Sequence, residues 1–118
     1  MTERVVFLNG LPLNAFPNQT VQMYVQKLDI ESFKDSIKFI KYHSNIPIAN
    51  YIRHKGTVEL LKKITGLELT PSSENWKYQP KDLIYVITLK NPQRGQEVAE
   101  LKEDDIDVYF VLVESQTE

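Results

Sequence analysis

The chain has no cysteine and only two histidines, His43 and His54. The lack of cysteine excludes disulfide bonds and thiolate metal ligands, and it is typical of intracellular proteins, so we expect a cytoplasmic location. The histidines and carboxylates show no spacing typical of a metal site. No apolar run is long enough to span a membrane, and the N-terminus lacks a signal-peptide pattern. We therefore expect a protein with no metal, no cofactor and no membrane partner.

Length and composition predict a single folded domain over residues 1–118. The chain is 42% hydrophobic and 25% charged, which is the usual balance of a soluble domain with one core. No repeat, low-complexity tract or linker divides it. Motifs for a phosphate-binding loop, a nucleophile elbow and a dinucleotide fingerprint are missing, so the common enzyme classes that carry them are not indicated.

The charged residues separate along the chain. Seven of the fourteen Lys and Arg residues lie between Lys34 and Lys63, where only Asp35 and Glu59 oppose them. Acidic residues gather instead in the range 97–107. A local positive region in a chain with a net charge of −2 favours a small anionic ligand over duplex DNA. The alternative is an ordinary solvated surface.

Hydrophobic patterns predict an α/β domain. Residues 5–8, 83–89 and 106–113 are continuous apolar or β-branched runs, which are typical of strands buried on both faces. The alternation in residues 21–25 predicts a half-buried strand. We expect a single mixed β-sheet of five or six strands, flanked by two or three helices.

The middle of the chain is expected to contain a short helix and a hairpin. Asp29 is a predicted N-cap for a helix over residues 30–35. Residues 37–41 and 46–52 then read as two strands joined by a turn, with His43 in the turn region. Pro47 predicts that the second strand lies at an edge or begins there, because proline cannot donate to a sheet ladder.

The junction between this predicted strand and the next helix carries the most distinctive residues. The helix opens near Thr57 and ends at Gly66. Amides and the positive dipole end at a helix start bind anions, and the residues before this start are Arg53, His54, Lys55 and Gly56. The pattern predicts a phosphate site beside a proton-transfer group. From the residues alone, His54 can equally be a surface or capping residue.

Three segments together resemble a known family. They are Val5-Val6-Phe7-Leu8-Asn9, Leu28-Asp29-Ile30-Glu31-Ser32-Phe33 and Ile52-Arg53-His54-Lys55-Gly56-Thr57. Over nearly its whole length the chain is similar to the viral anti-CRISPR ring nucleases and their cellular relatives. The strand-to-helix junction of that family usually reads Ile-Gly-His-x-Ser-Thr.

The resemblance implies a phosphodiester-cleaving enzyme. Members form homodimers that bind cyclic tetra-adenylate, the messenger of type III CRISPR systems, in a symmetric pocket. Without a metal, the ribose 2′-hydroxyl attacks its own phosphate, which yields linear di-adenylate with a 2′,3′-cyclic phosphate and ends the signal. His54 matches the family's general acid and Asn9 a ligand-pocket residue. Around the phosphate we expect Lys55 to supply charge, Gly56 to permit close approach, and Thr57 to donate its hydroxyl and amide.

The chain also departs from the family pattern. Arg53 stands where the family has glycine, and it either stabilises phosphate charge or points outward. Gly56 replaces a serine. A later family arginine has no clean equivalent, although Lys90 and Arg94 bracket its place. We prefer Arg94 as the ligand-binding residue, because the adjacent Gly95 marks a loop that can fold over a ligand; a salt bridge to the acidic segment is the alternative.

Two other classes of function stay open. The first is a sponge that binds a cyclic oligonucleotide without cutting it, which predicts stoichiometric protection of the ligand. The second is a small protein-interaction module, with Trp76, Tyr78 and Tyr85 at a partner surface or dimer face. In that case the substitution His54→Ala leaves the biological effect unchanged.

Overall fold

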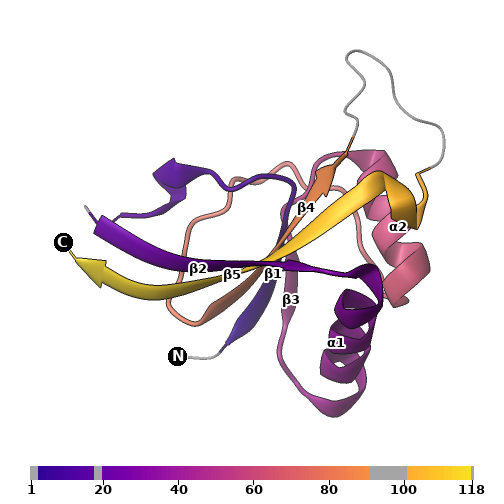
Figure 1. Ribbon diagram of the computed structural model, residues 1–118, viewed down its shortest axis with the longest axis horizontal. Coiled ribbons are helices and arrows are strands. Elements are labelled where there is room, and N and C mark those ends of the chain that lie inside the picture. Colours follow the sequence, from indigo (N-terminus) through magenta and orange to yellow (C-terminus); the bar gives the residue numbers. More distant parts are fainter. Residues whose placement is uncertain (1–2, 18–19, 91–100, 118) are drawn as a thin grey trace.

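The computed structural model describes residues 3–17, 20–90 and 101–117, the last three as backbone only (Figure 1). In chain order the elements are β1 (Arg4–Leu8), β2 (Thr20–Leu28), α1 (Ile30–His43), β3 (Ile48–Asn50), α2 (Lys55–Thr65), β4 (Asp82–Leu89) and β5 (Ile106–Thr117), with 3₁₀ turns at Leu13–Ala15 and Glu103–Asp105. The predicted α/β class, with one mixed sheet and flanking helices, is confirmed. None of the helices in these ranges has the length and apolar character needed to cross a membrane.

The sheet has the strand order β2-β5-β4-β1-β3. Strand β1 pairs in parallel with both β3 and β4, while β5 pairs antiparallel with β4 and β2. The three strands predicted from continuous apolar runs, β1, β4 and β5, all occupy internal positions. The predicted edge position is confirmed as well, since β3 begins directly after Pro47 and lies at the end of the sheet.

The predicted hairpin is wrong. Residues 30–43 form one helix of fourteen residues, so the expected first strand is the second half of α1 and His43 lies in its last turn. Phe33 and Ile37 are fully buried, four residues apart on one helix face, whereas Phe39 is 64% exposed. The alternation of apolar and polar residues around Phe39 therefore does not indicate a strand. The helix connects β2 at one edge of the sheet to β3 at the other.

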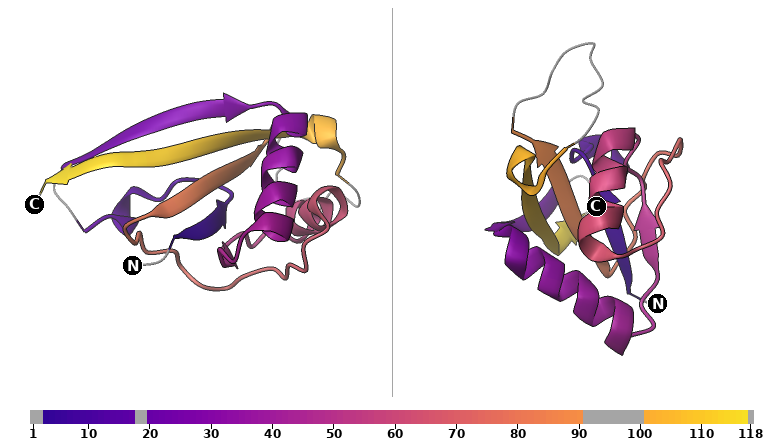
Figure 2. Two further views of the ribbon diagram at one scale, coloured as in Figure 1. Left: turned by 90° about the horizontal axis from the view of Figure 1, so that it is seen from below. Right: turned by 90° about the vertical axis from the view of Figure 1, so that its right-hand side faces the viewer.

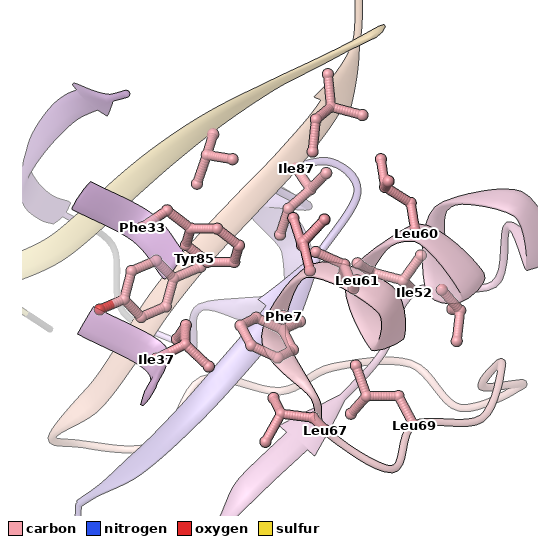
Figure 3. Packing of buried hydrophobic residues seen from close by; sticks show 14 of the residues in the cluster. Phe7, Phe33, Ile37, Ile52, Leu60, Leu61, Leu67, Leu69, Tyr85 and Ile87 are labelled. Carbon is pink, nitrogen blue, oxygen red and sulfur yellow. The ribbon is translucent and has the colours of Figure 1, made fainter. Parts of the chain in front are cut away.

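Both helices cover the same face of the sheet, and the paired strands β2 and β5 extend beyond them (Figures 1 and 2). The side chains of β1 alternate between two cores. Val5 and Phe7 pack with the helices, and the rings of Phe33 and Tyr85 each lie 6.1 Å from that of Phe7 in edge-on contact (Figure 3). On the opposite face, the core around Val6 and Leu8 is closed by loop residues that include Trp76.

The two helices have well-defined ends. Asp29 caps α1 as predicted, because its carboxylate accepts a hydrogen bond from the amide of Ser32 at 2.7 Å. Helix α2 ends at Gly66, whose left-handed φ of 74° suits glycine. Lys41 of α1 donates from Nζ to the Gly66 carbonyl at 2.6 Å, so the C-terminal ends of the two helices lie side by side. This contact fixes α2 at the end opposite to its His54 cap.

Candidate functional site at the carboxyl ends of the parallel strands

The parallel pairing of β1, β3 and β4 brings three chain segments to one edge of the sheet. Asn9 directly follows β1, residues 51–54 lead from β3 into α2, and Lys90 follows β4. Because β1 lies between the other two strands, Asn9 stands between the α2 junction and the end of β4. The carboxyl edge of parallel strands is where open α/β sheets commonly bind ligands. The topology thus supports the predicted grouping of Asn9 with the junction.

His54 is the N-cap of α2, which begins at Lys55, two residues earlier than predicted. Its Nδ1 accepts a hydrogen bond from the Thr57 amide at 3.1 Å, and Thr57 Oγ1 lies 3.0 Å from the same nitrogen. The His54 carbonyl accepts from the amide of Val58. The capping role that the residues left open is therefore confirmed. In the part of the chain that the structure describes, the second ring nitrogen, Nε2, has no hydrogen-bond partner.

The first-turn amides of α2 divide into two pairs. Those of Thr57 and Val58 are bonded to His54. Thr57 is also only 2% exposed, so neither its amide nor its hydroxyl is open to a phosphate in this structure. The amides of Lys55 and Gly56 have no partner within the described ranges. They are the groups that α2 offers to an anion, with the helix dipole behind them.

Arg53 turns onto a neighbouring loop. Its exposed guanidinium donates from one terminal nitrogen to Asn75 Oδ1 at 2.6 Å. That loop is in turn fixed to the β3 end of the sheet, because Ser72 donates its amide to the carbonyl of Ile52. A guanidinium has five N–H donors, so this contact leaves several for a phosphate.

A groove of about 430 Å³ opens beside Arg53. Its walls come from the end of β1 and the turn after it, from the β3–α2 connection, and from the loop before β4: Leu8, Asn9, Gly10, Leu11, Pro12, Tyr51, Arg53, Glu74, Asn75 and Trp76. Asn9 and Arg53 were predicted here. Tyr51, Glu74 and Asn75 were missed. For Glu74 and Asn75 the reason is that nothing in the polar stretch of residues 70–82 indicates which of its side chains fold back toward β1.

Lys90 is not brought to this groove. Lys90 follows Val86 by four residues, and Val86 is the register partner of Leu8, so Lys90 lies roughly 13 Å beyond the end of β1 along the strand direction. Its Nζ is 3.9 Å from a carboxylate oxygen of Asp107. Arg94 lies outside the described residues, and its predicted role stays a prediction.

The aromatic residues assigned to an interaction module are largely interior. Trp76 is 3% exposed and Tyr85 is 6% exposed, and Tyr78 is half-buried. Trp76 donates its indole N–H to the carboxylate of Asp82, which is itself buried. A partner surface built on Trp76 and Tyr85 therefore does not exist in the folded chain. Among the described residues, no three His, Asp or Glu side chains gather as a group able to hold a metal ion.

Comparison with known proteins agrees with this fold. The model of the STIV B116-like family matches residues 5–113. Among solved structures, B116 of Sulfolobus turreted icosahedral virus (STIV) superposes with a TM-score of 0.70 at 19% sequence identity, over 92% of this chain and 97% of B116. At this identity the superposition shows a shared fold alone, and no curated protein matches the chain in sequence. Because the family match spans almost all of the sequence, the chain belongs to the STIV B116-like family.

Proposed function

We propose that the chain is a metal-independent ring nuclease, which binds cyclic tetra-adenylate between two copies and cleaves it to linear di-adenylate with a 2′,3′-cyclic phosphate. One observation carries the proposal: His54 is held at the start of α2 by its Nδ1, while Nε2 has no partner among the described residues. The open amides of Lys55 and Gly56 follow it directly in the chain. A phosphate on these amides is within reach of a histidine proton donor.

The cleavage needs only groups that this junction and the substrate supply. The ribose 2′-oxygen attacks the adjacent phosphorus, the new 2′-O–P bond forms as the P–O5′ bond breaks, and the 2′-hydroxyl proton passes to water. Protonated His54 gives its Nε2 proton to the leaving O5′. Arg53 and Lys55 add positive charge beside the phosphate. One positioned proton donor contributes about 10²–10⁴ in rate, and alignment of the attacking hydroxyl supplies a further large part.

The groove beside Arg53 suits the base of one nucleotide. Side-chain amides such as those of Asn9 and Asn75 complement the N6 and N7 edge of adenine, and the ring of Tyr51 adds an aromatic wall. The volume of about 430 Å³ is at the low end for small-molecule sites, which span about 300–1,000 Å³. One groove therefore holds only part of a ring of four nucleotides, and a two-fold homodimer presents the groove twice, to two opposite nucleotides of the ring. Destroying this messenger in the cytoplasm suppresses type III CRISPR signalling.

The test compares the wild type with His54→Asn. Asparagine is a good N-cap, so this variant keeps α2 capped and removes only the titratable ring. The purified proteins are incubated with cyclic tetra-adenylate and EDTA, and the products are resolved by chromatography. We expect linear di-adenylate from the wild type, and an intact, bound ring with His54→Asn. An intact ring with the wild type after prolonged incubation contradicts the nuclease proposal.

A sponge is the second candidate, and the His54 geometry gives it support. A backbone amide can only donate, so the bond from Thr57 requires an unprotonated Nδ1. The neutral ring then carries its hydrogen on Nε2, where it can hold a phosphate oxygen but cannot readily give up its proton. A sponge protects one ring per binding site from a second nuclease and leaves that ring chemically unchanged. The same chromatographic assay separates the two candidates.

A further inference from the structure

The hydrogen bond from the Thr57 amide leaves Nδ1 of His54 without a hydrogen, so the proposed reaction needs a second state of the ring in which both nitrogens carry one. An acid ring carries hydrogens on both nitrogens. Its Nδ1–H can no longer face a donating amide without an acceptor nearby. Within the described residues, His54 has no ion pair that stabilises this charged form, and its charged chain neighbours, Arg53 and Lys55, are both positive.

We propose that the hydroxyl of Thr57 is the positioning group that lets His54 carry its proton in place. Thr57 Oγ1 lies 3.0 Å from Nδ1, beside the amide nitrogen at 3.1 Å. A hydroxyl both accepts and donates, whereas an amide only donates. Thr57 therefore offers Nδ1 a donor when the nitrogen is bare and an acceptor when it is protonated. This inference rests on the proposed function, since it concerns the proton that His54 gives to O5′.

The proton cycle then needs only a small turn of the ring, which moves Nδ1 from the Thr57 amide to the neighbouring hydroxyl. In the resting state, Nδ1 accepts from the Thr57 amide and Nε2 carries the hydrogen. Protonation by solvent at Nδ1 makes the cation, and Nδ1–H donates to Thr57 Oγ1. Transfer of the Nε2 hydrogen to O5′ leaves a neutral ring that still donates from Nδ1. A proton from solvent at Nε2 remakes the cation, and loss of the Nδ1 hydrogen to water returns the resting ring. Burial of Thr57, at 2% exposed, keeps its hydroxyl aligned through these steps.

The same helix offers a matched control. Thr65 is also 2% exposed, and its hydroxyl donates to the carbonyl of Leu61 at 2.5 Å, away from His54. The variants are Thr57→Val, which removes Oγ1 but keeps the amide and the branched shape, Thr57→Ser, which keeps the hydroxyl, and Thr65→Val. The ring of His54 is followed by NMR across pH, and its signal is identified by its loss in His54→Asn, since His43 is the only other histidine.

We expect Thr57→Val to move the midpoint of His54 ring protonation to lower pH by about one unit, because a hydrogen bond to a charged group has that order of effect. Ring cleavage near neutral pH should fall about tenfold, with its pH profile displaced in the same direction. Thr57→Ser should restore both values, and Thr65→Val should change neither.

An unchanged midpoint in Thr57→Val overturns the inference, whether or not the protein cleaves the ring. A displaced midpoint with undiminished cleavage also overturns it, because the hydroxyl then has no part in the reaction. If the wild type itself cleaves no ring, the proposed function fails and the proton cycle fails with it. That outcome is read from the wild-type assay alone, so the two failures are distinguishable.

Discussion

The guanidinium of Arg4 holds the carboxylate of Asp82 across β1 and β4 through two hydrogen bonds, Nε to Oδ1 at 2.8 Å and Nη2 to Oδ2 at 2.9 Å. The same carboxylate accepts from the Trp76 indole and the Gln79 amide, both at 3.1 Å. Arg4 also donates to the hydroxyl of Tyr51 at 3.1 Å. Since Tyr51 and Trp76 line the groove, this ion pair fixes two of its walls. The hydrogen bond and charge of Asp82 raise the pKa of Arg4.

Asp82→Ala should lower the free energy of unfolding by about 3–5 kcal/mol, because it leaves a partly buried guanidinium and a buried indole N–H without their acceptor. Urea denaturation measures the change. The control is Lys27→Met, which breaks the more exposed Lys27–Asp107 pair and should cost less than about 1 kcal/mol. Equal small losses in both variants contradict the assigned importance of the Arg4–Asp82 pair.

Tyr85 should make the fold sensitive to alkali. Burial raises the pKa of Tyr85 above its ordinary value of 10.0. A raised pKa in the folded state means that the stabilisation is fully present below the unfolded value and is lost as pH rises through the folded one. The free energy of unfolding, measured in urea at about pH 8 and about pH 11, should fall less in Tyr85→Phe than in the wild type. Tyr42→Phe, at a site 71% exposed, should behave like the wild type.

Asp29 should make the fold sensitive to acid, whereas Tyr85 makes it sensitive to alkali. Its hydrogen bond from the Ser32 amide lowers the pKa of the Asp29 carboxyl below the ordinary 3.8. A lowered pKa gives stabilisation that is present above the unfolded value and is lost as pH falls through the folded one. Asp29→Asn keeps an N-cap that does not titrate. Denaturation from neutral pH down to about pH 2.5 should therefore show a smaller acid loss in Asp29→Asn than in the wild type. Parallel curves refute the prediction.

Gly66→Ala should destabilise the chain by about 1–2 kcal/mol, since a Cβ is strained at the left-handed φ of 74° and would also lie 3.4 Å from Lys41 Nζ. Gly10→Ala is the matched control, because a Cβ there meets no atom within 4 Å. Thermal unfolding of both variants tests the comparison. A loss at residue 10 as large as that at residue 66 would mean that backbone conformation is not the cause.

Strands and helix ends were predicted correctly from the sequence where a local pattern is compatible with only one structure. The continuous apolar runs of β1, β4 and β5 identified the internal strands, because strands covered on both faces lack the polar alternation of a half-buried strand. Asp29 was recognised as a helix start by its capping carboxylate, and Gly66 as a helix end because glycine accommodates a left-handed backbone. Pro47 identified the edge strand for the same kind of reason.

Prediction failed where local patterns competed. Residues 37–41 show both a two-residue alternation and a helical spacing from Phe33 to Ile37, and only packing against the sheet decides between them. The residues that line the groove could not be predicted for a different reason. Asn75 reaches Arg53 because Asn50 and the chain after it hold residues 70–72 by hydrogen bonds, for instance from Asn50 Nδ2 to the Thr70 carbonyl at 2.8 Å. Such tertiary contacts leave no periodic signal in the sequence.

The capping geometry of His54 also bears on which substitutions this chain can accept at residue 54. Histidine and asparagine codons differ at a single nucleotide, and both residues can occupy an N-cap. On the proposed function, one point mutation at this codon therefore exchanges ring cleavage for ring capture while α2 stays capped. A lineage can cross between the two activities, in either direction, without passing through a poorly folded ancestor.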